Sequence, residues 1–79
     1  MTNAVSLVVF SKHDCALCDE LKERLRRWHI AFEECDIRLR EDWFECYRER
    51  VPVVRLPGGE EHDPPFSETL LAAWAAQNI

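Results

Sequence analysis

The sequence has no apolar run long enough to cross a membrane and no excess of basic residues. Over its 79 residues, every apolar stretch stays well below the roughly 20 residues that a membrane helix needs. Lys and Arg number 10 against 15 Asp and Glu, so the formal net charge is −5, and repulsion opposes a partner bound chiefly through phosphates. The start of the chain also lacks the basic residues and long apolar stretch of a secretory signal. We therefore expect a monomeric, cytoplasmic protein that binds neither nucleic acid nor a membrane.

Cysteine is too scarce for a disulfide-stapled scaffold, yet frequent for an ordinary domain. The 4 cysteines in 79 residues are about 5%, below the roughly 8–10% of disulfide scaffolds. Without an export signal, cysteines serve catalysis or metal binding more often than structure. Linkers, repeats and low-complexity segments are missing as well, so residues 1–79 are expected to form a single domain.

The hydrophobic pattern predicts an α/β domain with elements in the order β-α-β-α-β-β-α. Short apolar runs predict four strands, and helical spacing predicts three helices. The predicted strands are Val5–Phe10, Ile30–Ile37, Val51–Leu56 and Glu60–Asp63, and the predicted helices are Cys15–Trp28, Arg40–Arg48 and a last helix capped by Ser67. Strands joined through helices pair in parallel, whereas a tight turn makes a pair antiparallel. We therefore expect a four-stranded mixed sheet flanked by helices.

The first helix has a regular apolar stripe, and the third strand contains a proline. The stripe is predicted to bury Leu17, Leu21, Leu25 and Trp28. Pro52 has no N–H to give to a strand ladder, so its place inside a predicted strand needs a reason.

Two cysteines open the first helix directly after the first strand. In Cys15-Ala16-Leu17-Cys18 the spacing of three places both thiols on one face, near disulfide range. The unpaired N–H groups and positive dipole of a helix N-terminus favour a thiolate over a thiol. Cys15 lies at the exposed end and is the predicted nucleophile, and Cys18 is the predicted buried resolving thiol. The position of the pair indicates dithiol redox chemistry.

The whole chain resembles the glutaredoxin branch of the thioredoxin fold, and most closely the short bacterial glutaredoxin-like proteins. The residues that carry the resemblance run from the end of the first strand to the start of the last helix. They are Phe10–Glu20, Asp36-Ile37, Arg50–Val53, Gly59 and Pro65-Phe66.

The resemblance implies a thiol-disulfide oxidoreductase of thioredoxin/glutaredoxin-like fold, acting on small-molecule or protein disulfides without a bound cofactor. Cys15 and Cys18 match the nucleophilic and resolving cysteines. Lys12 matches a lysine beside the active site, and Val51-Pro52 matches a pair whose peptide bond is cis. Such a bond explains the anomalous proline, and it faces the backbone of Val51 toward Cys15, where a peptide or glutathione pairs.

Two segments differ from the glutaredoxin pattern, and both concern glutathione as a co-substrate. The Gly-Gly-x-x-Asp-type loop that helps to hold glutathione is replaced by Asp63-Pro64-Pro65-Phe66-Ser67. The Pro-Tyr pair between the cysteines is replaced by Ala16-Leu17, so no aromatic hydroxyl reaches the site.

The remaining residues leave several alternatives open. A non-catalytic adaptor, or a carrier of a metal or cluster, could use the same two cysteines. A site of all four cysteines is also conceivable, although Cys35 and Cys46 lack zinc-ribbon spacing and are expected to be an inert core thiol and a spare thiol. Three arginines near Pro52 either bind a substrate carboxylate or form a solvated basic face. They are Arg48, Arg50 and Arg55.

Overall fold

The computed structural model describes residues 7–77, and its elements follow one another in the predicted order. They are β1 (Leu7–Ser11), α1 (Ala16–Arg27), β2 (Phe32–Asp36), the 3₁₀ helix η1 (Ile37–Leu39), α2 (Glu41–Tyr47), β3 (Val53–Arg55), β4 (Glu61–His62) and α3 (Glu68–Gln77). Val5 and Ser6 of the first predicted strand lie outside the described residues. None of the helices in this part of the chain has both the length and the apolar character required to cross a bilayer.

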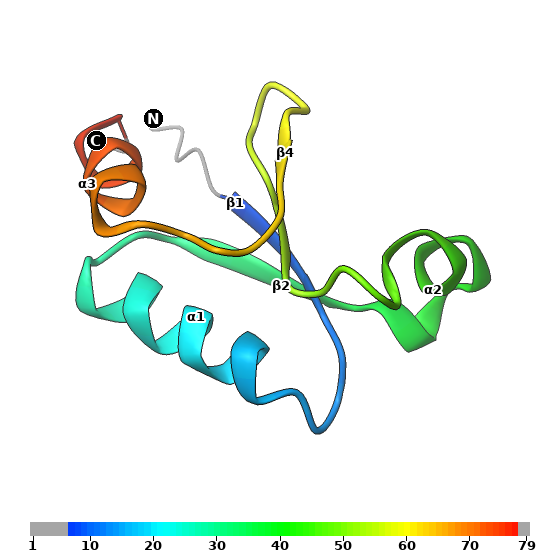
Figure 1. Ribbon diagram of the computed structural model, residues 1–79. Coiled ribbons are helices and arrows are strands. Elements are labelled where there is room, and N and C mark those ends of the chain that lie inside the picture. Colours follow the sequence, from blue (N-terminus) through cyan, green and yellow to red (C-terminus); the bar gives the residue numbers. More distant parts are fainter. Residues whose placement is uncertain (1–6, 78–79) are drawn as a thin grey trace.

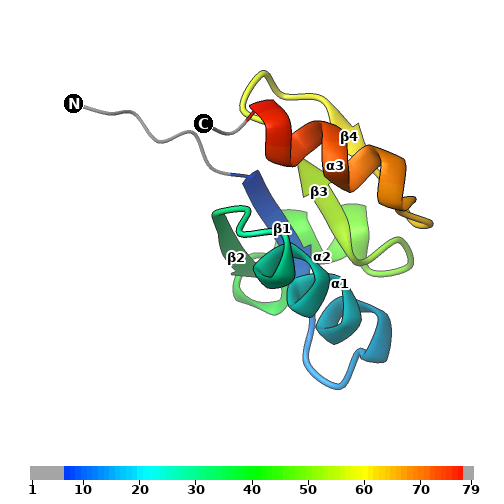
Figure 2. The same ribbon diagram turned by 90° about the vertical axis from the view of Figure 1, so that its left-hand side faces the viewer.

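The four strands form one mixed sheet in the order β2-β1-β3-β4, and all four are labelled in Figure 2. β1 pairs with β2 in parallel, with Leu7 opposite Phe32. β1 and β3 are antiparallel, with Phe10 opposite Val53, and β3 and β4 are antiparallel as well. The predicted mixed sheet is therefore confirmed.

β3 runs antiparallel to β1, although strands joined through a helix were expected to pair in parallel. Among the three pairs of the sheet, β1 and β2 are parallel. A crossover gives a parallel pair when its helix returns the chain along the sheet. Here the connection begins and ends at one end of the sheet, because Asp36 lies beside Ser11 and Val53 lies beside Phe10. The 7 residues of α2 extend only about 10 Å, and Figure 1 shows this helix beyond the end of the strands. β3 therefore runs antiparallel to β1.

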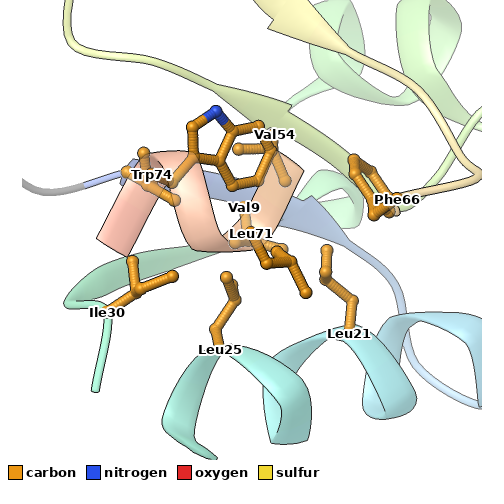
Figure 3. Packing of buried hydrophobic residues seen from close by; sticks show 9 residues of the cluster. Val9, Leu21, Leu25, Ile30, Val54, Phe66, Leu71 and Trp74 are labelled. Carbon is orange, nitrogen blue, oxygen red and sulfur yellow. The ribbon is translucent and has the colours of Figure 1, made fainter. Parts of the chain in front are cut away.

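Alternating side chains of the strands divide the core into two clusters. Val9 and Val54 face α1 and α3, while Phe10 and Val53 face α2. The turned view of Figure 2 shows α1 and α3 together on one side of the sheet. In Figure 3 the side chains of α1 point toward those of α3 and the sheet. That larger cluster holds Leu7, Val9, Leu21, Leu25, Ile30, Val54, Phe66, Leu71 and Trp74.

The buried face of α1 is rotated from the predicted stripe. Leu21 and Leu25 are buried as expected, but Leu17 is 57% exposed and Trp28 is 36% exposed. Cys18 takes the inner position instead and is fully buried. The helix therefore points Cys18 into the core and leaves Leu17 on the surface.

The start of α3 agrees with the predicted cap. The backbone N–H of Leu70 donates to Ser67 Oγ over 3.0 Å, which satisfies one of the free N–H groups of the first turn. Leu71 and Trp74 then face the core.

Glu61 joins α2 to the edge of the sheet. The buried Tyr47 donates its hydroxyl to Glu61 Oε2 over 2.7 Å, and Arg55 Nη2 donates to the same oxygen over 3.0 Å. The hydrogen bond from Tyr47, with those from Arg55, lowers the pKa of the Glu61 carboxyl although burial opposes the shift. A carboxyl with a lowered pKa contributes stability above its unfolded-state pKa and loses that contribution as the pH falls through the folded-state value.

Glu61→Gln is expected to lower the free energy of unfolding at neutral pH by about 1–2 kcal/mol, because the charge-assisted hydrogen bonds from Tyr47 and Arg55 are weakened. The loss of stability on acidification is expected to become shallower than in the wild type. Urea unfolding at several pH values measures both effects. Glu45→Gln removes an exposed carboxylate of α2 and serves as the control, with a change within about 0.5 kcal/mol. An unchanged pH dependence in the Glu61 variant would contradict the assignment.

Candidate functional site: the dithiol and its groove

The two cysteines of the predicted redox motif lie at the junction of β1 and α1. Cys15 has extended backbone angles and is the N-cap of α1. Its Sγ accepts the backbone N–H of Cys18 over 3.1 Å. The two residues are joined as a disulfide, with their Cα atoms 5.2 Å apart. A thiolate at Cys15 thus receives an N–H donor and the positive end of the helix dipole.

The two sulfur-bearing side chains differ in their access to solvent. Cys15 is partly exposed, whereas Cys18 has an exposed fraction of 0% and packs below the first turn of α1. An incoming disulfide meets Cys15 first, and Cys18 reaches Cys15 from inside the protein. This arrangement suits the nucleophilic and resolving roles predicted from the sequence.

Pro52 lines a hollow together with Leu17, the residue before Cys18, and the Val51–Pro52 peptide bond is cis, as the resemblance implied. Pro52 is buried and Val51 is partly buried against the cluster under α2. The N–H of Val51 already donates to the carbonyl of Tyr47 over 3.0 Å. A pairing role of Val51 toward a substrate therefore depends on its carbonyl oxygen.

A groove of about 420 Å³ runs from the first turn of α1 to the loop before α3. Its α1 wall includes the exposed Leu17, and its opposite wall is the proline-rich segment that ends at Phe66. The lining residues are Leu17, Glu20, Leu21, Arg24, Pro52, Pro64, Pro65 and Phe66. The sequence pattern predicted a buried Leu17, so this groove was missed. The two adjacent prolines directly before the α3 cap were the signal that could have indicated a rigid wall.

Lys12 does not line this groove. It is exposed and borders a polar hollow of about 280 Å³ on the opposite face of α1. Within that hollow Glu34 accepts hydrogen bonds from Lys22 Nζ over 2.7 Å and from Ser11 Oγ over 2.8 Å. The bond from Lys22, aided by Ser11 and opposed by desolvation, lowers the pKa of the Glu34 carboxyl. This network ties α1 to Ser11 at the end of β1 and to Glu34 in the middle of β2.

The other two cysteines lie away from the pair. Burial, aided by the charge of Glu33, raises the pKa of the partly buried Cys35 thiol, which keeps it protonated and unreactive. Cys46 is exposed on α2, with its Sγ 3.9 Å from Arg50 Nη1. Across residues 7–77, no three His, Cys, Asp or Glu side chains are grouped so that they could hold a metal ion. The four-cysteine site is therefore not formed.

Two of the three arginines near Pro52 form ion pairs with carboxylates of the protein itself. Arg50 Nη2 lies 3.0 Å from Asp63 Oδ1, and Arg55 Nη2 lies 3.0 Å from Glu61 Oε2. Arg48 lies over the ring of Phe44, at 5.7 Å from its centroid. Of the two readings left open by the sequence, these contacts favour structural roles over the binding of a substrate carboxylate.

Known proteins resemble this chain in sequence and fold. The family model described as Glutaredoxin-like domain (DUF836) matches residues 6–76. The X-ray structure of XcR50 from X. campestris superposes with a TM-score of 0.79 at 36% sequence identity, over 90% of this chain and 96% of that chain. The solution structure of XcR50 gives 0.76 at 36% identity, over 90% and 92%. The solution structure of Ne2328 from Nitrosomonas europaea gives 0.72 at 24% identity, over 92% of each chain, and shows similarity of fold.

Proposed function

Since the chain belongs to the Glutaredoxin-like domain (DUF836) family, we propose that it is a thiol-disulfide oxidoreductase that works through Cys15 and Cys18. The single observation that carries the proposal is the unequal exposure of a joined cysteine pair at a helix N-terminus. A pair that only stabilised the fold would gain nothing from leaving one sulfur accessible. Cytoplasmic thiols are kept reduced, and we place the activity there.

The reaction begins from the reduced pair. The Cys15 thiolate attacks one sulfur of a substrate disulfide, a mixed disulfide forms, and the other substrate sulfur leaves as a thiolate that takes up a proton. Cys18 then loses its proton and attacks the Sγ of Cys15. This forms the Cys15–Cys18 disulfide and releases the second substrate sulfur as a thiol. The substrate has gained two electrons, the protein has lost two, and a thiol reductant returns the pair to the dithiol.

Three structural features support the proposed reaction. The N–H of Cys18 donates to Cys15 Sγ and stabilises negative charge there. The Cα atoms of the pair lie at a separation that a disulfide bridges without movement of the helix. Pro52, whose peptide bond with Val51 is cis, lines the groove together with Leu17, which supports the proposal that a substrate backbone binds there.

A redox titration tests the proposal. We expect the Cys15–Cys18 disulfide to form and break reversibly in thiol-disulfide buffers, as measured by alkylation and mass spectrometry. A potential of about −200 to −230 mV resembles glutaredoxins, and one of about −270 mV resembles thioredoxin. The reduced protein is also expected to reduce hydroxyethyl disulfide in the presence of a dithiol. Absence of catalysed reduction, together with stoichiometric zinc or iron in protein purified without oxygen, would favour the carrier instead.

A further inference from the structure

We propose that the groove beside the dithiol selects polypeptide disulfides in which the reacting cysteine is flanked by an apolar residue and a basic residue. This inference rests on the proposed function, and it names the substrate class of the same site. The preference for an apolar residue follows from the groove walls, and the preference for a basic residue follows from the carboxylate of Glu20. The acidic tripeptide glutathione is then a poor substrate.

The walls of the groove are apolar. Leu17 leaves 57% of its surface exposed only two residues after Cys15, and it shares the groove with Pro52 and the Pro64–Phe66 segment. Covering exposed apolar surface of this kind is favourable by roughly 25 cal/mol for each Å² removed from water. An apolar side chain next to the substrate cysteine can therefore cover Leu17 while the sulfur lies at Cys15.

The proline-rich wall of the groove gives an anion few backbone donors, because Pro64 and Pro65 have no N–H. In the first turn of α3 the N–H of Leu70 already donates to Ser67 Oγ, and the carboxylate of Glu68 is paired with Arg24. The carboxylates of glutathione thus find no donor on the two prolines.

The charges that line the groove favour a cation. Arg24 is the basic residue of the lining, but its Nη2 donates to Glu68 Oε2 over 2.6 Å and is neutralised by that ion pair. Glu20 also lines the groove, and within residues 7–77 no basic side chain forms an ion pair with it. Glu20 lies one turn after Leu17 on α1, so a basic residue close to the apolar one can approach it.

The test uses single-turnover reactions of the reduced protein with synthetic peptides whose cysteine is joined to pyridine-2-thiol. Release of pyridine-2-thione, followed by its absorbance, gives the second-order rate constant at low salt. The probes flank the cysteine with leucine and lysine, leucine and glutamate, or serine and lysine. The glutathionyl pyridyl disulfide is the fourth probe.

The leucine-lysine peptide is expected to react about tenfold faster than the leucine-glutamate peptide and the glutathionyl probe, because one charge attraction is replaced by one repulsion. About 1 M salt is expected to bring the ratio close to one. Glu20→Gln is expected to reduce the ratio to about threefold or less, and Glu20→Lys to reverse it. Leu17→Ser is expected to abolish the preference for leucine over serine.

Glu45→Gln is the matched control, because it removes the same charge from α2, on the other face of the sheet. It is expected to leave the ratio unchanged. Equal rates for the basic and acidic peptides, fastest reaction of the glutathionyl probe, or an equal effect of Glu20→Gln and Glu45→Gln would each overturn the inference while leaving the oxidoreductase intact. No reaction above background with any probe would overturn both. Thermal unfolding of each variant confirms that it is folded before its rates are compared.

Discussion

Cys15→Ser is expected to reduce disulfide exchange to the background of the assay. The thiolate is the nucleophile in this chemistry, and a serine hydroxyl at the same place neither ionises at neutral pH nor forms a disulfide. Cys18 remains in this variant, but it is fully buried and a substrate disulfide cannot reach it. Reduction of hydroxyethyl disulfide by a dithiol, followed with and without the variant, measures the loss.

Cys18→Ser is expected to have a different effect on the same reaction. The first attack by Cys15 proceeds, but the mixed disulfide is no longer resolved from inside and accumulates with one substrate unit per protein. Intact-mass spectrometry detects that adduct. Cys46→Ser, which removes an exposed thiol on α2, is the control and keeps wild-type turnover. Wild-type turnover in Cys15→Ser would sink the proposed mechanism.

Leu25→Ala is expected to have the largest effect on stability. Leu25 is 0% exposed and, as Figure 3 shows, points from α1 into the cluster formed with α3 and the sheet. Removing a buried leucine side chain costs about 2–5 kcal/mol. For 79 residues the total free energy of unfolding is only roughly 4–12 kcal/mol, so a large share of it is lost.

The comparison that isolates burial is Leu39→Ala, since Leu39 is 75% exposed in η1. It deletes the same atoms at the surface and is expected to change stability by less than about 0.5 kcal/mol. Urea unfolding monitored by circular dichroism compares both variants with the wild type. Similar losses in the two variants would show that the α1–α3 cluster does not hold the fold together.

The order of the elements and the position of the cysteine pair could be predicted because they depend on local signals. The change from an apolar run to helical spacing indicates where β1 ends and α1 begins, and Cys15 and Cys18 lie across that boundary. Ser67 was found in the same way, since a capping hydroxyl acts on an N–H three residues later. Such signals need no knowledge of distant contacts.

The rotation of α1 and the direction of β3 could not be predicted, because they depend on packing. Leu17 and Cys18 are adjacent, and periodicity alone ranks the leucine as the better core residue. In the folded protein Cys18 is buried instead and Leu17 is exposed, because the packing of α1, and not its periodicity, decides which of the two faces inward. The direction of β3 depends on whether α2 lies along the sheet or past its end, and that is decided by contacts of Phe10 and Tyr47 across the chain.

In the proposed mechanism, the complete burial of Cys18 separates the capture of a substrate from its release. In that mechanism Leu17 and Glu20 at the rim select the partner, and the buried thiol of Cys18 sets the lifetime of the mixed disulfide. Substitutions at the rim are therefore expected to change which molecules react without changing how long the mixed disulfide lasts. The two properties can diverge independently among proteins that share this fold.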